Sequence, residues 1–465
     1  MGKIMPSLIN RTLTEHRGSP RIYLDDAILD ELEVDSENPF YDRIWQDDKL
    51  ILRLNPNGKY KISSKAKNSS RVHVIDINLA KLSELFDLNS KLRIAIKKGS
   101  IIIKRHAIES AIKLRESSFL KALSQNKLTM ASLCHGGGLL DHAMHSGFKK
   151  ADISTSVSFA VEIDDRYLNS SIRNNPHLFN DQSVYINSDI ADVNPHNMTQ
   201  VNVLTAGLPC TGASLSGKSK NKLSFAEEHE SAGACFFSFL NIVKGCGAAL
   251  VVLENVKQYI GTASFAVIKS VLGSLGFDLL TDVYVGTDFG ATERRERMVC
   301  LALSKGLNKS NVLSSISEHL EGLKTPSTPI ADILDDVPLD HPSWKEVEYL
   351  KLKEEKDRNL GKGFRMQLLE PSAESCGVLG AGYAKARSTE ARMLHPINKA
   401  LSRLFNKREH ARIKKAPESI VDGLSETVAH QILGNGVIVS LFEALAYSIG
   451  IVAKRLLPLP ATLAA

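Results

Sequence analysis

From Leu128 onward, short apolar runs alternate with segments of helical periodicity, and this alternation limits the fold more than any other feature. The runs are Met130–Cys134, Val157–Val161, Val184–Asp189, Val201–Ala206 and Ala248–Leu253. Strands separated by helices form βαβ units, which build a parallel sheet covered by helices. Two further runs, Asp282–Val285 and Met298–Leu303, have the pattern of a closing strand pair. We therefore expect an α/β fold with a doubly wound sheet over residues 128–304.

Glycines and acids follow the first three runs directly. Gly136, Gly137 and Gly138 separate the first run from a helix, Glu162 ends the second, and Asp189 ends the third. Ligands of open parallel sheets bind beyond the carboxyl ends of the strands, where an acid can accept hydrogen bonds from ribose hydroxyls. A glycine turn lets the backbone approach such a ligand. Each feature alone also fits a tight turn or a solvated strand end, but together they favour a nucleoside-containing cofactor.

A cysteine and a glutamate end the next two runs. Pro209-Cys210 follows the fourth run and Glu254-Asn255-Val256 ends the fifth. A lone cysteine at such a corner is more often a buried packing residue. A buried acid, however, needs a partner or a task. A thiolate paired with a carboxylic acid suits attack on an electron-poor ring, because the sulfur adds while the acid protonates a ring nitrogen.

Four segments of residues 128–455 resemble, in order, motifs of the C5-cytosine DNA methyltransferases. They are Gly207-Leu-Pro-Cys210-x-x-x-Ser214, Glu254-Asn-Val256, Glu293-x-Arg295-x-Arg297 and Gly434-Asn-Gly-Val437. The glycine turn, Glu162 and Ser188-Asp189 match the cofactor motifs that precede them. The resemblance implies a Rossmann-like methyltransferase sheet that uses S-adenosylmethionine. It also implies that Cys210 attacks C6 of a flipped cytosine, that Glu254 protonates N3, and that Arg295 and Arg297 orient the base, its phosphate or the thiolate.

The resemblance also assigns binding residues. Those expected at the cofactor are Leu133, Gly136, Gly138, Glu162, Ile163, Asp189, Ile190, Leu208, Pro209, Asn435 and Val437. Those expected at the DNA are Ser214, Lys218, Asn255, Lys385, Arg387 and Arg403, and a lysine-bearing loop over 212–222 is expected to close over the base. The sequence departs from the family at four positions: Cys134 replaces phenylalanine, Leu139 glycine, Glu293 glutamine and Gly436 serine.

The remaining segments predict the domain organisation. Residues 1–20 read as a loose arm, and residues 21–105 as a weak α+β repeat similar to AbrB-like regulator domains. A linker helix is expected over 106–127. A target-recognition domain is expected over 305–400, a return to the catalytic domain over 401–455, and a tail over 456–465.

Charge and cysteine spacing bear on three classes of partner: nucleic acids, metal ions and membranes. Lys and Arg number 58 against 52 Asp and Glu, a net charge of +6, and basic residues gather between Lys385 and Lys415. Such a cluster fits phosphate contact as well as a solvated face. The six cysteines form no metal-binding spacing, so no metal site is expected. No apolar run has membrane-span length and no signal-peptide pattern occurs, which favours a cytoplasmic protein without membrane partners.

We therefore predict a sequence-specific DNA (cytosine-5-)-methyltransferase of restriction-modification, phage or plasmid type that acts on double-stranded DNA. The resemblance also admits a cognate restriction endonuclease as a partner. A tRNA cytosine-5 methyltransferase and a catalytically silent DNA-binding regulator stay open as alternatives. A nicotinamide-dependent oxidoreductase is disfavoured, because Gly136–Gly138 lacks the GxGxxG spacing.

Overall fold

The computed structural model describes residues 7–25, 27–67, 70–209, 234–361, 365–387 and 389–458. The chain divides into two compact units, Met1–Leu114 and Arg115–Ala465. Each unit has its own hydrophobic core.

A seven-stranded sheet organises the second unit, with the order β13-β12-β11-β14-β15-β17-β16. The strands are β11 (Lys127–Leu133), β12 (Ser154–Glu162), β13 (Val184–Asn187), β14 (Val203–Gly207), β15 (Leu250–Asn255), β16 (Phe277–Val285) and β17 (Glu296–Ser304). The first five strands in this order pair in parallel, whereas β17 runs antiparallel to both neighbours. The predicted α/β fold and its closing strand pair are thus confirmed.

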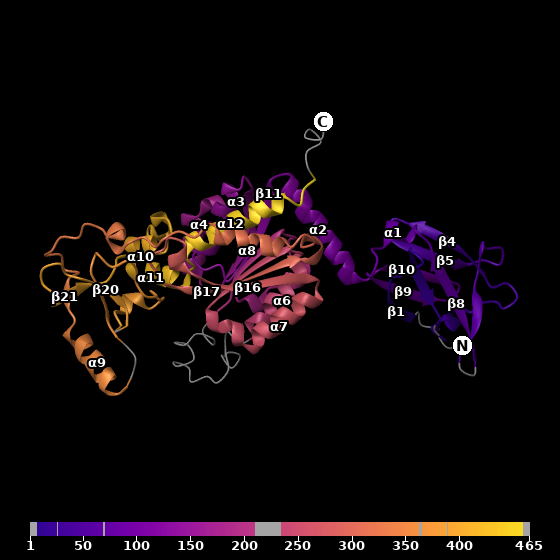
Figure 1. Cartoon of the computed structure of the whole chain (residues 1–465), viewed down its shortest axis with the longest axis horizontal. Coiled ribbons are helices and arrows are strands. Elements are labelled where there is room, and N and C mark those ends of the chain that lie inside the picture. The colour runs from indigo at the N-terminus through magenta and orange to yellow at the C-terminus, as the bar shows by residue number, and fades with distance from the viewer. Residues whose placement is uncertain are drawn as a thin grey trace. The chain divides into compact units, whose positions relative to one another are not determined.

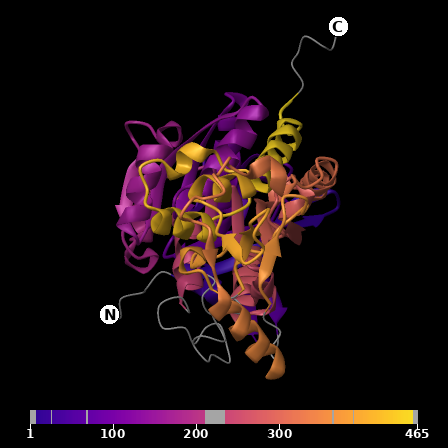
Figure 2. The same cartoon turned by 90° about the vertical axis from the view of Figure 1, so that its left-hand side faces the viewer.

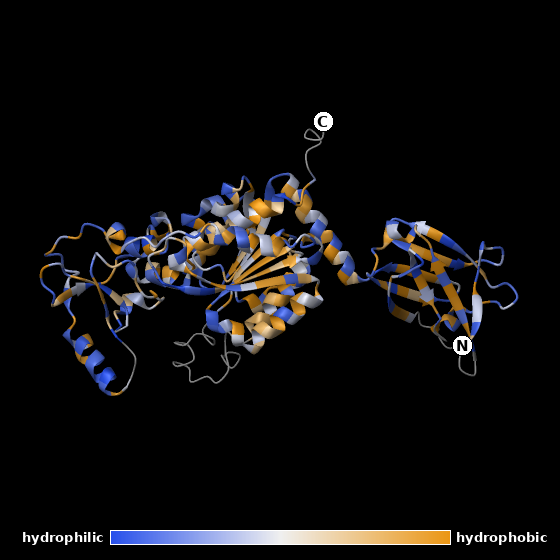
Figure 3. Ribbon diagram, viewed as in Figure 1, coloured by the Kyte–Doolittle hydropathy of each residue, from blue (hydrophilic) through white to orange (hydrophobic). Residues whose placement is uncertain are grey.

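Helices cover both faces of this sheet, as Figure 1 shows. One face packs against α3 (Leu139–Lys150), α8 (Val312–Glu321) and α12 (Val439–Lys454), and the other against α6 (Cys235–Cys246) and α7 (Ala263–Ser274). All six residues of β15 are buried, which explains why its sequence is a continuous apolar run that ends in Glu254-Asn255. Figure 3 shows these strands as an orange layer between the helices. The sheet therefore places the ends of β11, β12, β14 and β15 at one edge.

A smaller sheet of order β18-β21-β20-β19 forms a second part of this unit, and it faces the viewer in Figure 2. Its elements are β18 (Lys345–Glu346), α9 (Glu348–Asn359), β19 (Gln367–Leu369), β20 (Ala391–Leu394) and β21 (Leu401–Arg403), and α10 (Lys407–Ile413) and α11 (Glu426–Asn435) follow. The structure differs from the predicted limits at 305 and 400. The apolar side of α8 belongs to the large core, and β21 pairs with β20 beyond residue 400.

The first unit is a β structure with two sheets, β1-β9-β10-β5-β4-β6 and β2-β3-β8-β7. Its elements are β1 (Ser7–Thr12), β2 (Thr14–His16), β3 (Ser19–Leu24), η1 (Ala27–Leu32), β4 (Phe40–Gln46), β5 (Lys49–Leu54), β6 (Tyr60–Lys61), β7 (Ser63–Lys67), β8 (Ser70–Asn78), α1 (Leu82–Leu85), β9 (Lys91–Lys97) and β10 (Ser100–Arg105). The order strand, short helix, hairpin occurs twice, and β3 pairs with β8 as β5 pairs with β10. The likeness to AbrB-like domains stays a prediction.

The predicted loose arm over residues 1–20 is corrected by the structure. β1 pairs with β9 over six residues, and β2 forms a hairpin with β3. Leu13, between β1 and β2, has no exposed surface and lies in the core of this unit. The segment is polar in composition because only alternate side chains of its strands face the core.

The linker helix predicted over 106–127 corresponds to α2 (Ala107–Ser124). This helix crosses the division between the two units, which lies between Leu114 and Arg115. From Arg115 onward it packs on the second unit. The Arg115 guanidinium donates to the carbonyls of Leu275 and Gly276 at 3.0 and 2.7 Å, and Phe119 and Leu123 enter the large core. In the described part of the chain no single helix is long and apolar enough to cross a membrane, although α11 and α12, bent by 42°, pass that test as a pair.

Candidate active site

The glycine turn after β11 is held by the acid that ends β12. Oε2 of Glu162 accepts a hydrogen bond from the Gly136 amide at 2.6 Å, and its Oε1 accepts one from the Asp164 amide at 3.0 Å. Gly136 has φ +58°, and a side chain there would meet open space. The turn is therefore left-handed and open on one side, which suits close approach of a ligand to the backbone.

A buried polar network supports this turn from beneath. The His135 ring lies between Oδ2 of Asp141, at 2.8 Å from Nδ1, and Oγ of Ser171, at 2.7 Å from Nε2. Asn175 donates to the Gly137 carbonyl at 3.1 Å, and Thr205 of β14 donates to Asp141 at 2.6 Å. Sequence reasoning missed this network, because its members are brought together only when α3 and α4 (Asp165–Asn174) pack beside the sheet.

The end of the chain returns to the same turn. A Cβ atom on Gly137 would lie 2.3 Å from the Ile432 side chain of α11, and one on Gly436 would lie 2.7 Å from Leu139. Both glycines thus permit close packing that a larger residue would block. The motif at 434–437 therefore lies against the glycine turn, as the family resemblance implies. Two departures from the family also compensate each other, because Leu139 fills the space that Gly436 leaves.

The expected cofactor residues differ in exposure. Leu133, Ile190, Leu208 and Val437 are buried, whereas Ile163 is 67% exposed and Pro209 and Asn435 are also exposed. Asp189 accepts from the Ala191 amide through Oδ1 at 2.8 Å, and no described residue bonds its other oxygen. These groups fit a nucleoside. Ile163 offers an apolar side chain beside the acid Glu162, and the neighbouring strands end in a second acid, Asp189, and in the open backbone of Gly136.

Cys134, the residue in place of the family's phenylalanine, lies close to both acids. Its hydrogen bond with Cys235, burial and the charges of Glu162 and Asp189 all raise the pKa of the Cys134 thiol well above its ordinary value. The thiol therefore stays protonated and is a poor nucleophile. Burial likewise raises the pKa of the Cys246 thiol to about 11, and it also raises the pKa of the Cys300 thiol.

An ion pair and a side-chain amide lie at the ends of β14 and β15, where the sequence predicts the catalytic residues. Nε of Arg297 lies 2.7 Å from Oε1 of Glu254, and both side chains are about one-tenth exposed. Asn255, 1% exposed, donates to the Leu208 carbonyl at 3.2 Å. Cys210, two residues after Leu208, lies outside the described residues, as do Ser214, Lys218 and the loop 212–222. Asn255 thus holds the backbone that leads to Cys210, which differs from its expected contact with DNA.

Arg295 lies in a different buried cluster. It donates to the Gly434 carbonyl at 2.9 Å and lies 3.4 Å from Oε1 of Glu293, whose Oε2 bonds the ammonium of Lys414. Burial alone would raise the pKa of Glu293, but Lys414 and Arg295 lower it. Glu293 also accepts from the Leu379 amide at 2.8 Å. The cluster connects the residues just before β17 with Leu379, Lys414 and Gly434. Sequence reasoning missed Lys414 because it lies 121 residues from Glu293.

The residues expected at the DNA divide into two groups. Lys385 and Arg387 are exposed, beside the turn at Tyr383–Lys385. Arg403 is 3% exposed, and its guanidinium binds both oxygens of Glu409 at 2.7 Å. The expected DNA contact of Arg403 is therefore corrected to a structural ion pair between β21 and α10. The sequence alone suggested DNA contact because Arg403 lies in a basic stretch, but in the folded chain the buried carboxylate of Glu409 neutralises its charge.

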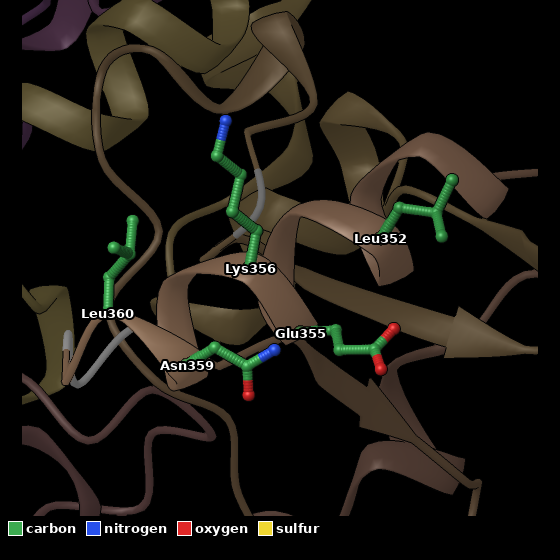
Figure 4. Close-up of a pocket in the computed structure, with 5 residues that line it drawn as sticks. All are labelled: Leu352, Glu355, Lys356, Asn359 and Leu360. Carbon is green, nitrogen blue, oxygen red and sulfur yellow. The ribbon is translucent and has the colours of Figure 1, made fainter.

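A shallow depression of about 330 Å³ runs along α9 and is lined by Leu352, Glu355, Lys356, Asn359 and Leu360 (Figure 4). Figure 4 shows these side chains pointing away from a single helix without a convergent set of polar groups. None of them belongs to the predicted site. A catalytic role for this depression has no support in its geometry.

Comparisons with known proteins concern the family of this chain. A model of the C-5 cytosine-specific DNA methylase family matches residues 128–450. The type II methyltransferase M.SsoII of Shigella sonnei is 27% identical over 272 residues, which cover 56% of this chain and 67% of that protein. M1.ScrFI of Lactococcus lactis subsp. cremoris is 28% identical over 310 residues, 64% of this chain and 73% of that protein.

Among solved structures, the S. pombe Dnmt2 methyltransferase has a TM-score of 0.54 at 18% identity and covers 71% of this chain and 99% of that one. At this identity the likeness concerns the fold alone. The family model, by contrast, covers more than half of the chain, and the residues of all the motifs described above lie within its match. The chain therefore belongs to the C-5 cytosine-specific DNA methylase family.

Proposed function

We propose that the protein is a DNA (cytosine-5-)-methyltransferase that modifies a flipped cytosine within a specific sequence of double-stranded DNA. The observation that carries this proposal is the Arg297–Glu254 ion pair at the end of β15, beside the strand that leads to Cys210. The family model and the type II methyltransferases among its relatives support the substrate class. A restriction-modification, phage or plasmid origin follows from these relatives by analogy, and the site of action would be the cytoplasm.

The proposed chemistry uses residues of the two neighbouring strand ends. The Cys210 thiolate forms a bond to C6 of the cytosine while Glu254 gives a proton to N3, which makes C5 nucleophilic. Arg297 fixes the Glu254 carboxyl group so that it faces the ring. C5 takes up the methyl group that the cofactor would supply, and methylated C5 then loses its proton to a base. The C6–sulfur bond breaks and N3 returns its proton to Glu254, so the Cys210 thiolate, the Glu254 acid and the aromatic ring are all restored.

S-adenosylmethionine, when bound, supplies the electrophilic methyl group. Glu162 and the Gly136 backbone would hold its ribose, Asp189 its adenine amine, and Ile163 one face of the adenine. Asn435, exposed at the end of α11, would contact it from the segment that packs against the glycine turn. Arg295 acts through Gly434, and we assign it a positioning role.

A covalent trap tests the proposal. Duplex DNA carrying 5-fluorocytosine cannot lose a C5 proton, so wild-type protein with S-adenosylmethionine should form a stable adduct. The Cys210→Ser variant should form none, although it should still bind the cofactor. Absence of an adduct with the wild type, over a library of target sequences, would overturn the enzyme assignment, and an adduct with Cys210→Ser would overturn the nucleophile.

Methyl transfer to tRNA, measured beside transfer to DNA, decides between the two nucleic acids. Transfer to tRNA alone would leave the cytosine chemistry intact and overturn the DNA substrate. Bisulfite sequencing of DNA from expressing cells would then identify the recognised sequence. Methylation of every cytosine, regardless of context, would contradict sequence specificity.

A further inference from the structure

The outer face of the six-stranded sheet in the first unit carries two rows of basic side chains. Residues that pair across antiparallel strands point to the same face. The registers of β1, β9, β10, β5 and β4 therefore assign each side chain either to the core or to the outer face. Leu92, Ile94, Ile101, Ile103 and Leu50 are fully buried, so their alternate neighbours form the outer face.

One basic row crosses three strands and the other crosses two, with an apolar row between them. Arg93, Lys104 and Lys49 pair in sequence across β9, β10 and β5. The second basic row consists of Lys97, four residues after Arg93 on β9, and Arg53, four residues after Lys49 on β5. The apolar row consists of Leu8, Ala95, Ile102, Ile51 and Ile44, each paired with the next. We call these three rows the basic face.

Acidic residues are almost absent from these strands. β1, β9, β10 and β5 contain no Asp or Glu, and β4 contains only Asp42. Asp42 lies opposite Arg53, but its two oxygens accept from the Asn55 side-chain amide at 2.6 Å and from the Lys59 backbone amide at 3.1 Å. The basic face is therefore positive by a wide margin, although the whole chain carries a net charge of only +6.

Most of these cations are exposed and free of ion pairs. Arg93, Lys97 and Arg53 are exposed, and no ion pair with the described residues involves them. Lys104 lies 3.1 Å from Asp48 in a turn, but the two side chains are 46% and 65% exposed, so that ion pair is weak. Cations without counter-charges on one face attract a partner of opposite charge.

The chemistry of the face distinguishes between partners. A second copy would place cations against cations, which costs free energy on association. Unpaired bases need aromatic rings for stacking, and the apolar row contains only aliphatic side chains. Four residues of strand separate the two basic rows by about 13 Å. This spacing is close to the width of the major groove of B-DNA, about 12 Å, so the rows can reach phosphates on both of its sides.

We propose that the basic face is a second DNA-binding surface, which contacts the phosphates of duplex DNA without reading its sequence. It lies on the unit that contains none of the catalytic motifs, and it does not depend on the chemistry proposed for the second unit. Its contribution is an electrostatic affinity for DNA that keeps the enzyme on the polymer between target sites.

Binding of the full chain to a duplex built only of A·T pairs tests this surface. Such DNA contains no cytosine, so failure of the proposed methyl transfer cannot alter the result. The triple variant Arg53→Ala/Arg93→Ala/Lys97→Ala removes one cation for each of three expected phosphates. Its binding constant should fall at least tenfold at low salt. The slope of the logarithm of this constant against the logarithm of salt concentration should decrease by about 0.9 for each phosphate that is no longer neutralised.

A matched control separates this face from net charge. Arg17→Ala/Arg71→Ala/Lys113→Ala removes the same charge from exposed positions of the same unit that lie outside the basic face. It should keep the wild-type salt slope, and so should Arg53→Lys/Arg93→Lys, which retains the charges. An equal decrease in the control would overturn the proposal. A wild-type dimer that the first triple variant dissociates, with DNA binding unchanged, would assign the face to a second copy instead.

Discussion

At the scale of single residues, the departures from the family pattern have partners that explain them. Glu293 replaces a glutamine, and the ammonium of Lys414 compensates its charge in a place where neither side chain is exposed. Burial, together with the neighbouring Arg295, lowers the pKa of Lys414 to about 7. A buried ion pair is costly to break from one side, because the remaining charge keeps its desolvation penalty.

Glu293→Gln, which restores the family residue, should therefore destabilise the protein. The expected loss in the free energy of unfolding is about 3 kcal/mol, because Lys414 would lose its counter-charge in the interior. Glu293→Gln/Lys414→Met should recover most of that loss. Urea denaturation of the three proteins measures both quantities. A single variant as stable as the wild type would show that the pair contributes nothing.

The packing of Leu139 against Gly436 leads to a second prediction. Gly436→Ser would bring a Cβ atom to 2.7 Å from Leu139, which requires repacking at a cost of about 1–3 kcal/mol. Leu139→Ala removes the clash, so the double variant should be more stable than the sum of the two single changes predicts. Because this packing joins the first and last cofactor motifs, the affinity for S-adenosylmethionine should follow the same pattern in calorimetry. Additive effects would contradict the coupling.

At the scale of elements, the sequence predicts the buried strands better than the paired edges. β14 and β15 follow from continuous apolar runs, and the residues that end them follow from the geometry of a parallel sheet. β1 was missed, because its polar sequence becomes a strand only by pairing with β9, some eighty residues later. The network of His135 and Asp141 could not be predicted either, since it requires the packing of α3 and α4 beside β11.

The packing of α10 against α11 predicts sensitivity to acid. Nδ1 of His410 lies 2.8 Å from Nδ1 of His430. Burial, with the nearby charges of Lys414, His430 and Arg295, lowers the pKa of His410 well below its ordinary value. The unfolded chain binds a proton at this residue below about pH 6.5, whereas the folded chain does not. Folding stability should therefore decrease as the pH falls below that value.

Replacement of His410 by asparagine tests this element. The variant should be less stable than the wild type at neutral pH, because it loses packing, but its Tm should fall less on acidification. Asparagine in place of the exposed His16 provides the control and should leave the pH dependence unchanged. A variant whose Tm falls as far as that of the wild type on acidification would show that His410 is not the acid-sensitive group.

At the scale of the whole molecule, the two units share a helix but no hydrophobic core. The core of the first unit ends with β10, whereas Phe119 and Leu123 of α2 belong to the core of the second. Arg115 also bonds Ser304 at 2.9 Å, and Glu116 accepts from the Gly306 amide at 2.8 Å. The second half of α2 is thus part of the catalytic unit, although the family model begins only at residue 128.

Two truncations follow from this division. A chain that begins at His106 keeps α2, and it should retain the Tm of the catalytic unit and its methyl transfer, while the salt-dependent affinity assigned to the basic face disappears. A chain that begins at Leu128, where the family match starts, lacks Phe119, Leu123 and the Arg115 hydrogen bonds. Removing even one such buried aromatic side chain costs about 3 kcal/mol or more, so this chain should be strongly destabilised. Calorimetry and methyl-transfer assays on both chains compare them directly, and equal stability of the two would mean that α2 belongs only to the first unit.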